Sequence, residues 1–163
     1  MIILGIDPGY AIVGYGVVEY KNMHFRTLAY GAITTPANTK PENRIKMIYD
    51  ELETLIQMYK PDCMAIEELF FNTNQKTAIV VAEARGVMLL CAVNKGLNIY
   101  EYTPLQVKQA VVGYGRAEKK QVIAMVVNVL NLEKKPKYDD TADALAIAIC
   151  HAHTNGSLLS KLL

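Results

Sequence analysis

The chain has 163 residues, of which 52% are hydrophobic and 20% are charged, and its formal net charge is +1. These values predict one globular domain over residues 1–163 with a substantial hydrophobic core. Charged residues interrupt each apolar run, and no basic-then-apolar leader is visible at the start. We therefore expect neither a membrane span nor export, and place the protein in the cytoplasm.

Hydrophobic patterning predicts three strands at the start of the chain. Residues 2–6 are continuously apolar, as in a central strand that is covered on both faces. Pro8 and Gly9 then favour a turn, and residues 12–20 and 23–34 have the pattern of two further strands. The close spacing of these strands predicts an antiparallel meander.

The remainder of the chain predicts alternating helices and strands, with Thr103 and Pro104 as a specific helix start. The expected elements are a helix over 41–59, a strand over 62–67, a helix over 74–94, a strand over 97–102, and helices over 104–113, 118–131 and 140–153. An antiparallel meander followed by strand–helix–strand units predicts an α/β fold. Its sheet should be a five-stranded mixed sheet with helices on both faces.

Four carboxylates stand beside elements that could aim them inward. Asp7 follows the first strand, Glu67 ends the fourth, and Asp140 and Asp143 lie one turn apart at the start of the last helix. Carboxylates at the ends of buried strands are costly unless a cation meets them. An all-oxygen set suits a hard cation such as Mg²⁺, and two such ions about 4 Å apart commonly hydrolyse phosphodiesters. The set therefore suggests a metal-dependent nuclease.

Simpler interpretations of these acids stay open. The two aspartates of the last helix would complement the helix dipole, with Asp139 as a cap. Asp7 could belong to an ordinary hairpin turn. Glu67 and Glu68 point to opposite faces of a strand, so only one of them can join the set. We expect Glu68 at the surface or behind the ligands.

Basic residues and glycines gather in the segment between two predicted helices. Lys108, Arg116, Lys119 and Lys120 surround residues 112–115, which include two glycines. Flexible basic loops beside a helix N-terminus suit phosphates, so these residues are candidate DNA contacts. A solvated loop would have the same composition.

Phe70 and Phe71 are adjacent rings in a predicted loop of a chain with only three Phe residues. Two neighbouring rings in an extended segment cannot both face one core. One of them could therefore stack on a nucleobase, a contact worth about 1–3 kcal/mol. The alternative is that both rings pack beneath the following helix.

The helix predicted over 74–94 is apolar on all sides. Such a helix lies either deep in a core or against a second subunit. Ala78, Ala82 and Gly86 recur every four residues and would allow another helix to approach closely. An isologous homodimer and a purely internal role both fit this pattern.

The cysteines and histidines receive no catalytic role. Cys63, Cys91 and Cys150 lie inside apolar runs, as buried reduced thiols of a cytosolic protein do. His151 and His153 lie near the end of the last predicted helix, where a cation is favourable.

Taken together, these stretches resemble the RuvC family of bacterial Holliday junction resolvases. The matching segments are Gly-Ile-Asp-Pro-Gly with Gly-Tyr-Gly-Val within 5–17, Ala-Ile-Glu-Glu-Leu-Phe at 65–70, Ala-Arg-Gly-Val at 84–87, Glu-Tyr-Thr-Pro-Leu-Gln-Val-Lys-Gln at 101–109, Val-Val-Gly-Tyr-Gly-Arg-Ala-Glu-Lys at 111–119 and Asp-Thr-Ala-Asp-Ala-Leu-Ala-Ile-Ala at 140–148. No single segment is decisive. The ordered set is highly specific and spans nearly the whole chain.

The resemblance implies an RNase H-like fold and a crossover junction endodeoxyribonuclease acting in recombination and repair. It implies a homodimer that binds a four-way DNA junction, with two Mg²⁺ ions in each active site and Mn²⁺ as a substitute. It also suggests a RuvA–RuvB branch-migration complex as a partner. By position, the implied metal ligands are Asp7, Glu67, Asp140 and Asp143.

Other site residues follow from the same resemblance. Phe70 matches a ring that inserts near the crossover, and Lys108 and Lys119 match residues that contact phosphate near the cut. Lys119 is the candidate for neutralising developing phosphate charge. Some family members have His where this chain has Asp140, and relatives can have Gln where it has Glu68.

Three rival functions share some of these features. The turn after Asp7 also occurs in actin-like ATPases, but this chain is short for two such subdomains and has no second phosphate loop. An RNase H-like enzyme that cuts RNA would carry the same acidic set. A catalytically dead DNA-binding module would lack one of the acids, and none is missing.

Overall fold

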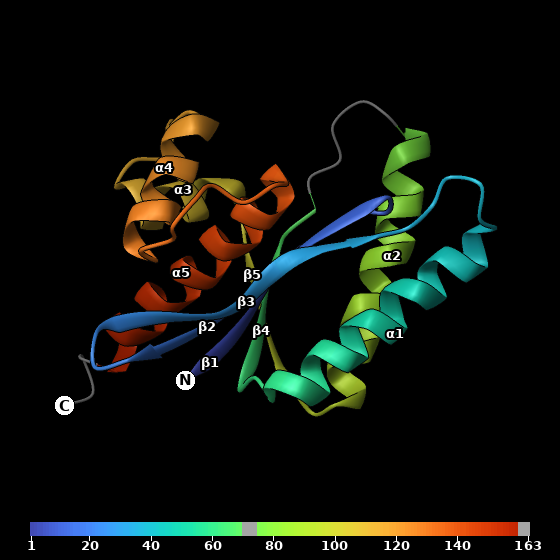
Figure 1. The fold of residues 1–163 in the computed structure, drawn as a ribbon, viewed down its shortest axis with the longest axis horizontal. Helices are drawn as coiled ribbons and strands as arrows, with labels where there is room; N and C mark the ends of the chain where they lie inside the picture. The colour runs from blue at the N-terminus through green and yellow to red at the C-terminus, as the bar shows by residue number, and fades with distance from the viewer. Residues whose placement is uncertain (70–74, 160–163) are drawn as a thin grey trace.

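The computed structural model describes residues 1–69 and 75–159, which form a five-stranded sheet between two groups of helices (Figure 1). The elements are β1 (Ile2–Asp7), β2 (Ile12–Lys21), β3 (His24–Thr34), α1 (Pro41–Tyr59), β4 (Cys63–Glu67), α2 (Gln75–Asn94), β5 (Asn98–Tyr102), α3 (Pro104–Val112), α4 (Lys119–Val129) and α5 (Asp139–Leu159). Their kinds and order are those expected from the sequence.

The sheet has the strand order β3-β2-β1-β4-β5. β1, β2 and β3 pair antiparallel, whereas β4 runs parallel to both β1 and β5. The sheet is therefore mixed, as predicted. Helices α1 and α2 cover one face and α3, α4 and α5 cover the other (Figure 1).

Strand alternation decides which side chains meet α5. In β1, Ile3 belongs to the core beneath α5, whereas Leu4 belongs to the core beneath α1 and α2. In β4, Ala65 faces α5 in the same way as Ile3. Because successive side chains point to opposite faces, Asp7 and Glu67 continue the α5-facing rows of their two strands. The neighbouring strands β1 and β4 thus present two carboxylates to one helix.

Two glycines let the backbone of α5 lie directly on the sheet. A Cβ atom added to Gly14 would lie 2.0 Å from the carbonyl oxygen of Asp140, and one added to Gly5 would lie 2.2 Å from that of Ala144. Both positions therefore exclude any side chain. Since Gly14 pairs with Asp7 across the β1–β2 ladder, this contact places the first turn of α5 beside Asp7.

Helix α2 is buried on one face only. Ala84, Met88 and Cys91 are fully buried, whereas Ile79 and Leu90 are 61% and 54% exposed. By length and composition alone, the window Thr77–Asn94 is apolar enough to cross a membrane, although only 22% of it is buried in this fold. Interruption by charged residues therefore does not by itself rule out a span here, contrary to the sequence argument.

The last helix differs from expectation. α5 covers Asp139–Leu159, longer than the predicted 140–153, so His151 lies inside the helix and not at its end. His151 is 1% exposed; its Nδ1 lies 2.7 Å from the Tyr102 hydroxyl and its Nε2 lies 3.3 Å from Cys63 Sγ. Burial lowers the pKa of His151. The predicted cation at a helix terminus is therefore wrong for this residue.

Candidate active site

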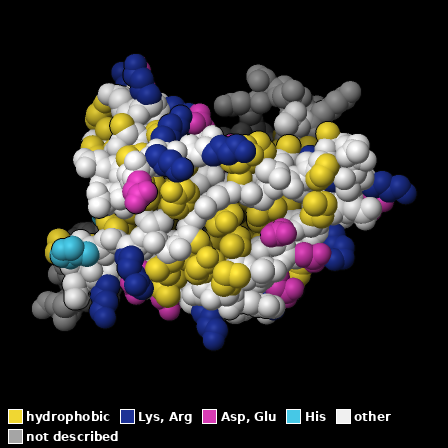
Figure 2. Space-filling view, in the orientation of Figure 1, with side chains coloured by type: hydrophobic (Ala, Val, Ile, Leu, Met, Phe, Trp, Pro, Cys, Tyr) yellow, Lys and Arg dark blue, Asp and Glu magenta, His cyan; other side chains and the backbone are white. Residues whose placement is uncertain are grey.

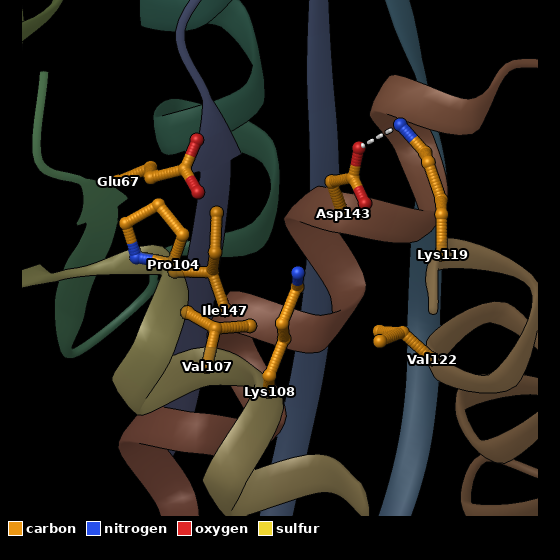
Figure 3. Close-up of a pocket in the computed structure, with 8 residues that line it drawn as sticks. All are labelled: Glu67, Pro104, Val107, Lys108, Lys119, Val122, Asp143 and Ile147. Atoms are coloured by element: carbon orange, nitrogen blue, oxygen red, sulfur yellow. Dashed lines mark hydrogen bonds and ion pairs between the residues drawn. The ribbon is translucent and has the colours of Figure 1, made fainter. Parts of the chain in front are cut away.

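A cavity of about 210 Å³ opens between β4, α3, α4 and α5. Glu67 projects into it from the end of β4, and Asp143 projects into it from the second turn of α5 (Figure 3). Lys108 points from α3 toward the space between these carboxylates. The described lining residues are Glu67, Pro104, Val107, Lys108, Lys119, Val122, Asp143 and Ile147.

Asp7 is a buried acid whose pKa is affected by the other three carboxylates. Its burial raises its pKa to about 8, with further upward contributions from Asp143, Glu67 and Asp140, in that order. Lys119 opposes this shift. The charges of the other three predicted acids thus all reach Asp7, although the four carboxylates come from three separate parts of the sequence.

The pKa values of Glu67 and Asp143 are raised as well. Burial is the main cause for each, and the charge of Asp143 adds to the shift at Glu67. Asp140 does not line the cavity, but it adds to the repulsion felt by Asp143. Carboxylates that destabilise one another in this way form a site whose charge a cation would neutralise.

Lys119 supplies cationic charge in this structure. Its Nζ donates a hydrogen bond to Asp143 Oδ2 at 2.7 Å (Figure 3). Lys119 is the first residue of α4, and its side chain is 54% exposed. The ammonium group therefore stands at the mouth of the cavity, between the acidic set and solvent.

The donor set fits a hard divalent cation in its chemistry. The four carboxylates offer only oxygen ligands, and burial together with neighbouring negative charge raises the pKa values of Asp7, Glu67 and Asp143. Among residues 1–69 and 75–159, no three His, Cys, Asp or Glu side chains converge closely enough to form a ready metal site. In this structure Asp143 Oδ2 is paired with Lys119, which leaves Oδ1 of the same carboxylate as an oxygen donor for a cation.

The remaining basic candidates do not all enter the cavity. Lys120 lines an adjacent groove of about 570 Å³ together with Lys119 and Lys135. Figure 2 shows Lys and Arg side chains over this part of the molecule, where α4 and the start of α5 lie. Arg116 is exposed between α3 and α4 and lines neither hollow. Glu68 is exposed, as predicted for a surface acid.

The two aromatic candidates, Phe70 and Phe71, lie outside the described residues. The sequence analysis missed a different neighbour of the site, Arg85 of α2. Its Nε donates to the carbonyl oxygen of Glu67 at 3.3 Å. Arg85 does stand within the matched segment Ala-Arg-Gly-Val, which was the only signal available for it.

Comparison with known proteins identifies the family of this chain. A model of the family "Crossover junction endodeoxyribonuclease RuvC" matches residues 3–151. A crossover junction endodeoxyribonuclease RuvC from Alkaliphilus oremlandii is 62% identical over 154 residues, covering 94% of this chain and 94% of the relative.

Solved structures agree as well. Thermus thermophilus RuvC matches with a TM-score of 0.89 and 34% identity, covering 96% of each chain. The same organism's RuvC in complex with a Holliday junction substrate matches with a TM-score of 0.88 and 32% identity, again over 96% of each chain. The RNase H-like fold is thereby confirmed. With the acidic cavity in the expected place, the chain belongs to the RuvC family of crossover junction endodeoxyribonucleases.

Proposed function

We propose that this protein resolves four-way DNA junctions by Mg²⁺-dependent hydrolysis, with Asp7, Glu67, Asp140 and Asp143 as the metal ligands. The observation that carries the proposal is that Glu67 and Asp143 line one cavity of a RuvC-family chain, while their charges and that of Asp140 raise the pKa of the buried Asp7. The related Thermus thermophilus protein has been solved with a Holliday junction substrate, which supports the same substrate for this chain.

The carboxylates would hold two Mg²⁺ ions, or Mn²⁺ in their place. When bound, such ions lower the pKa of an attacking water and stabilise the leaving oxygen of the phosphodiester. Asp7 must lose its proton before it can serve as a ligand, because its pKa lies near 8. Asp143 would exchange its hydrogen bond with Lys119 for a bond to the ion when Lys119 turns to the phosphate. The chain's own residues therefore change partners before catalysis.

The lysines have separate tasks in this proposal. Once released from Asp143, Lys119 can reach a phosphate oxygen at the cavity mouth and neutralise charge that develops there. Lys108 reaches into the same cavity from α3 and would hold the phosphate near the cut. Lys120 and Arg116, both exposed, would contact the DNA backbone farther out.

A homodimer would place two such cavities on one junction. The exposed face of α2 carries Ile79, Gly86, Leu90 and Val93, which share one side of the helix. A Cβ atom added to Gly86 meets nothing within 4 Å, so this face has room for a second helix. A two-fold dimer on a two-fold junction would make symmetric cuts.

Three further parts of the proposal come from the resemblance. Phe70 would insert near the crossover and Phe71 would lie beside the DNA. A RuvA–RuvB complex would deliver the junction. A cytoplasmic location fits the three cysteines, which are all buried and free of disulfides.

A cleavage assay on three substrates tests the function. We expect cutting of a four-way junction in Mg²⁺, with little cutting of duplex or of an RNA–DNA hybrid, and none in the presence of a chelator. Asp7→Asn should bind the junction and fail to cut it. Asp50→Asn is the matched control, because Asp50 is an exposed acid of α1 that pairs with Lys46. Equal cutting of all three substrates would refute junction selectivity.

A further inference from the structure

Arg85 connects three elements at the edge of the active site. Its side chain, from the middle of α2, is only 13% exposed. Nε donates to the carbonyl oxygen of Glu67 at 3.3 Å, and Nη2 lies 2.9 Å from Oε2 of Glu101 on β5. One guanidinium group thus contacts the last residue of β4 and a residue of the neighbouring parallel strand.

This contact acts on the peptide that carries a proposed metal ligand. The β4–β5 ladder closes where Glu68 N donates to the carbonyl oxygen of Tyr102 at 2.9 Å. Arg85 holds the carbonyl of Glu67 immediately before that hydrogen bond. The peptide between residues 67 and 68 is therefore fixed at both its N–H and its C=O. The direction in which Glu67 enters the cavity depends on this peptide.

Arg85 does not act through its charge on the Glu67 carboxylate. The pKa of Glu67 is raised, first by burial and then by Asp143, while Lys119 and Lys108 are the cations that oppose the shift. The strand alternation explains this. Glu67 faces α5, whereas α2, which carries Arg85, packs against the opposite face of the sheet.

Burial of the Arg85 guanidinium group is costly if the group serves stability alone. Nη2 is buried and has no well-aligned hydrogen-bond acceptor among the described residues, and the Glu101 carboxylate is 48% exposed. Ion pairs of this kind add little to stability. The buried guanidinium group of Arg85 is instead explained by its role in holding the Glu67 peptide in a fixed orientation.

We propose that Arg85 is a positioning residue, which holds the Glu67 peptide so that the carboxylate meets the divalent ion in a fixed orientation. The inference rests on the proposed role of Glu67 as a ligand. Residues that orient ligands from behind change metal affinity by about 10–100-fold when they are removed.

The test measures Mn²⁺ binding without DNA, by electron paramagnetic resonance of the free ion, beside single-turnover junction cleavage over a Mg²⁺ titration. Arg85→Ala should bind Mn²⁺ about tenfold more weakly and need correspondingly more Mg²⁺ for half-maximal cleavage. Its binding to the junction in a chelator should stay within about twofold of the wild type, because Arg85 makes no proposed DNA contact.

Three further variants sharpen the result. Lys95→Ala is the matched control, since Lys95 directly follows the last residue of α2 and pairs with Glu53 of α1, away from the cavity. It should leave Mn²⁺ affinity unchanged even if it lowers the melting temperature. Arg85→Lys keeps the charge but cannot hold both contacts, so it should restore affinity only in part. Glu101→Gln leaves Arg85 in place and should cause a smaller loss.

A double-variant comparison separates this inference from the proposed function. In a Glu67→Gln background, adding Arg85→Ala should weaken Mn²⁺ binding no further. If both Arg85 variants bind Mn²⁺ as tightly as the wild type, the positioning role is wrong. Arg85→Lys retains the charge, so it provides this test even if Arg85→Ala is unstable. Wild-type affinity and cleavage in Glu67→Gln alone would instead overturn the ligand role of Glu67.

Discussion

Lys119 and Asp143 lie 24 residues apart and join at 2.7 Å, so an ammonium group occupies the edge of the acidic cavity. The pair has two consequences. It relieves part of the repulsion among carboxylates whose pKa values are raised by burial. It also brings the candidate phosphate-binding lysine into direct contact with one proposed metal ligand.

Replacing Lys119 by alanine should slow cleavage far more than it weakens junction binding. The variant loses the cation that we propose for the phosphate at the cut, an interaction worth about 10²–10³-fold in rate at comparable sites. Single-turnover cleavage at saturating Mg²⁺ measures the effect. Lys46→Ala provides the control, because Lys46 is an exposed lysine of α1 that pairs with Asp50 and has no proposed DNA contact. Equal rate losses in the two variants would contradict a specific role for Lys119.

Asp7→Asn should make the metal-free protein more stable at alkaline pH. The unfolded carboxyl ionises near 3.8 and the folded one near 8, so the folded state holds the proton more tightly in between. The wild type therefore loses stability relative to the variant as pH rises from about 4 to about 8. Each kcal/mol corresponds to roughly 2–4 °C in melting temperature for a chain of this size.

Thermal unfolding in a chelator at several pH values checks this expectation. The difference between Asp7→Asn and wild type should be small at acidic pH, grow through neutrality and level off above the folded pKa. Asp50→Asn should show no comparable growth. A constant difference across the range would mean that Asp7 is not a buried acid in the folded protein.

Gly14→Ala should disturb the site and the fold together. The new Cβ would lie 2.0 Å from the backbone oxygen of Asp140, so α5 must move relative to β1 and β2. Overpacking of this kind costs about 1–3 kcal/mol. Cleavage per folded molecule should also fall, so the loss of activity should exceed the loss of folded protein.

Gly16→Ala is the comparison for that variant. It lies on the same strand and against the same helix, but its nearest contact is the end of the Leu145 side chain at 2.5 Å. A side chain can turn away, so cleavage per folded molecule should be largely kept. Chemical denaturation with parallel activity measurements distinguishes the two. The backbone-contact argument fails if Gly16→Ala is the more damaging change.

Leu90→Glu should weaken self-association without unfolding the subunit. Leu90 is 54% exposed on α2, and glutamate is compatible with a helix. A charge in a proposed apolar interface is costly to bury. Sedimentation over a concentration series reports the change, and Met58→Glu on the exposed face of α1 serves as the control. A dimer that is indifferent to Leu90→Glu would have to use another surface.

Much of the fold could be predicted because periodicity is a local property. The α1 boundaries, Pro41 and Tyr59, follow from apolar spacing and from the proline at the start. The two carboxylates at strand ends could also be placed together, since β1 and β4 are adjacent parallel strands. Helix α5 continues to Leu159, beyond its predicted end at 153.

The rest of the site depends on contacts between distant segments. No local pattern pairs Lys119 with Asp143, and only the matched segment Ala-Arg-Gly-Val distinguishes Arg85 from an ordinary surface arginine. The same holds for His151, whose neighbours Tyr102 and Cys63 come from two strands. Such contacts follow from how the helices cover the sheet, which residue spacing alone does not determine.

The glycine contact beneath α5 has a consequence for divergence within this architecture. The offset between the aspartates of α5 and the carboxylate of β1 is fixed by main-chain atoms in touch with one another. Valine, isoleucine and leucine can therefore replace one another in either apolar layer without changing that offset. Core side chains can therefore change during evolution or redesign, while contacts between backbone atoms keep the spacing of the acidic residues constant.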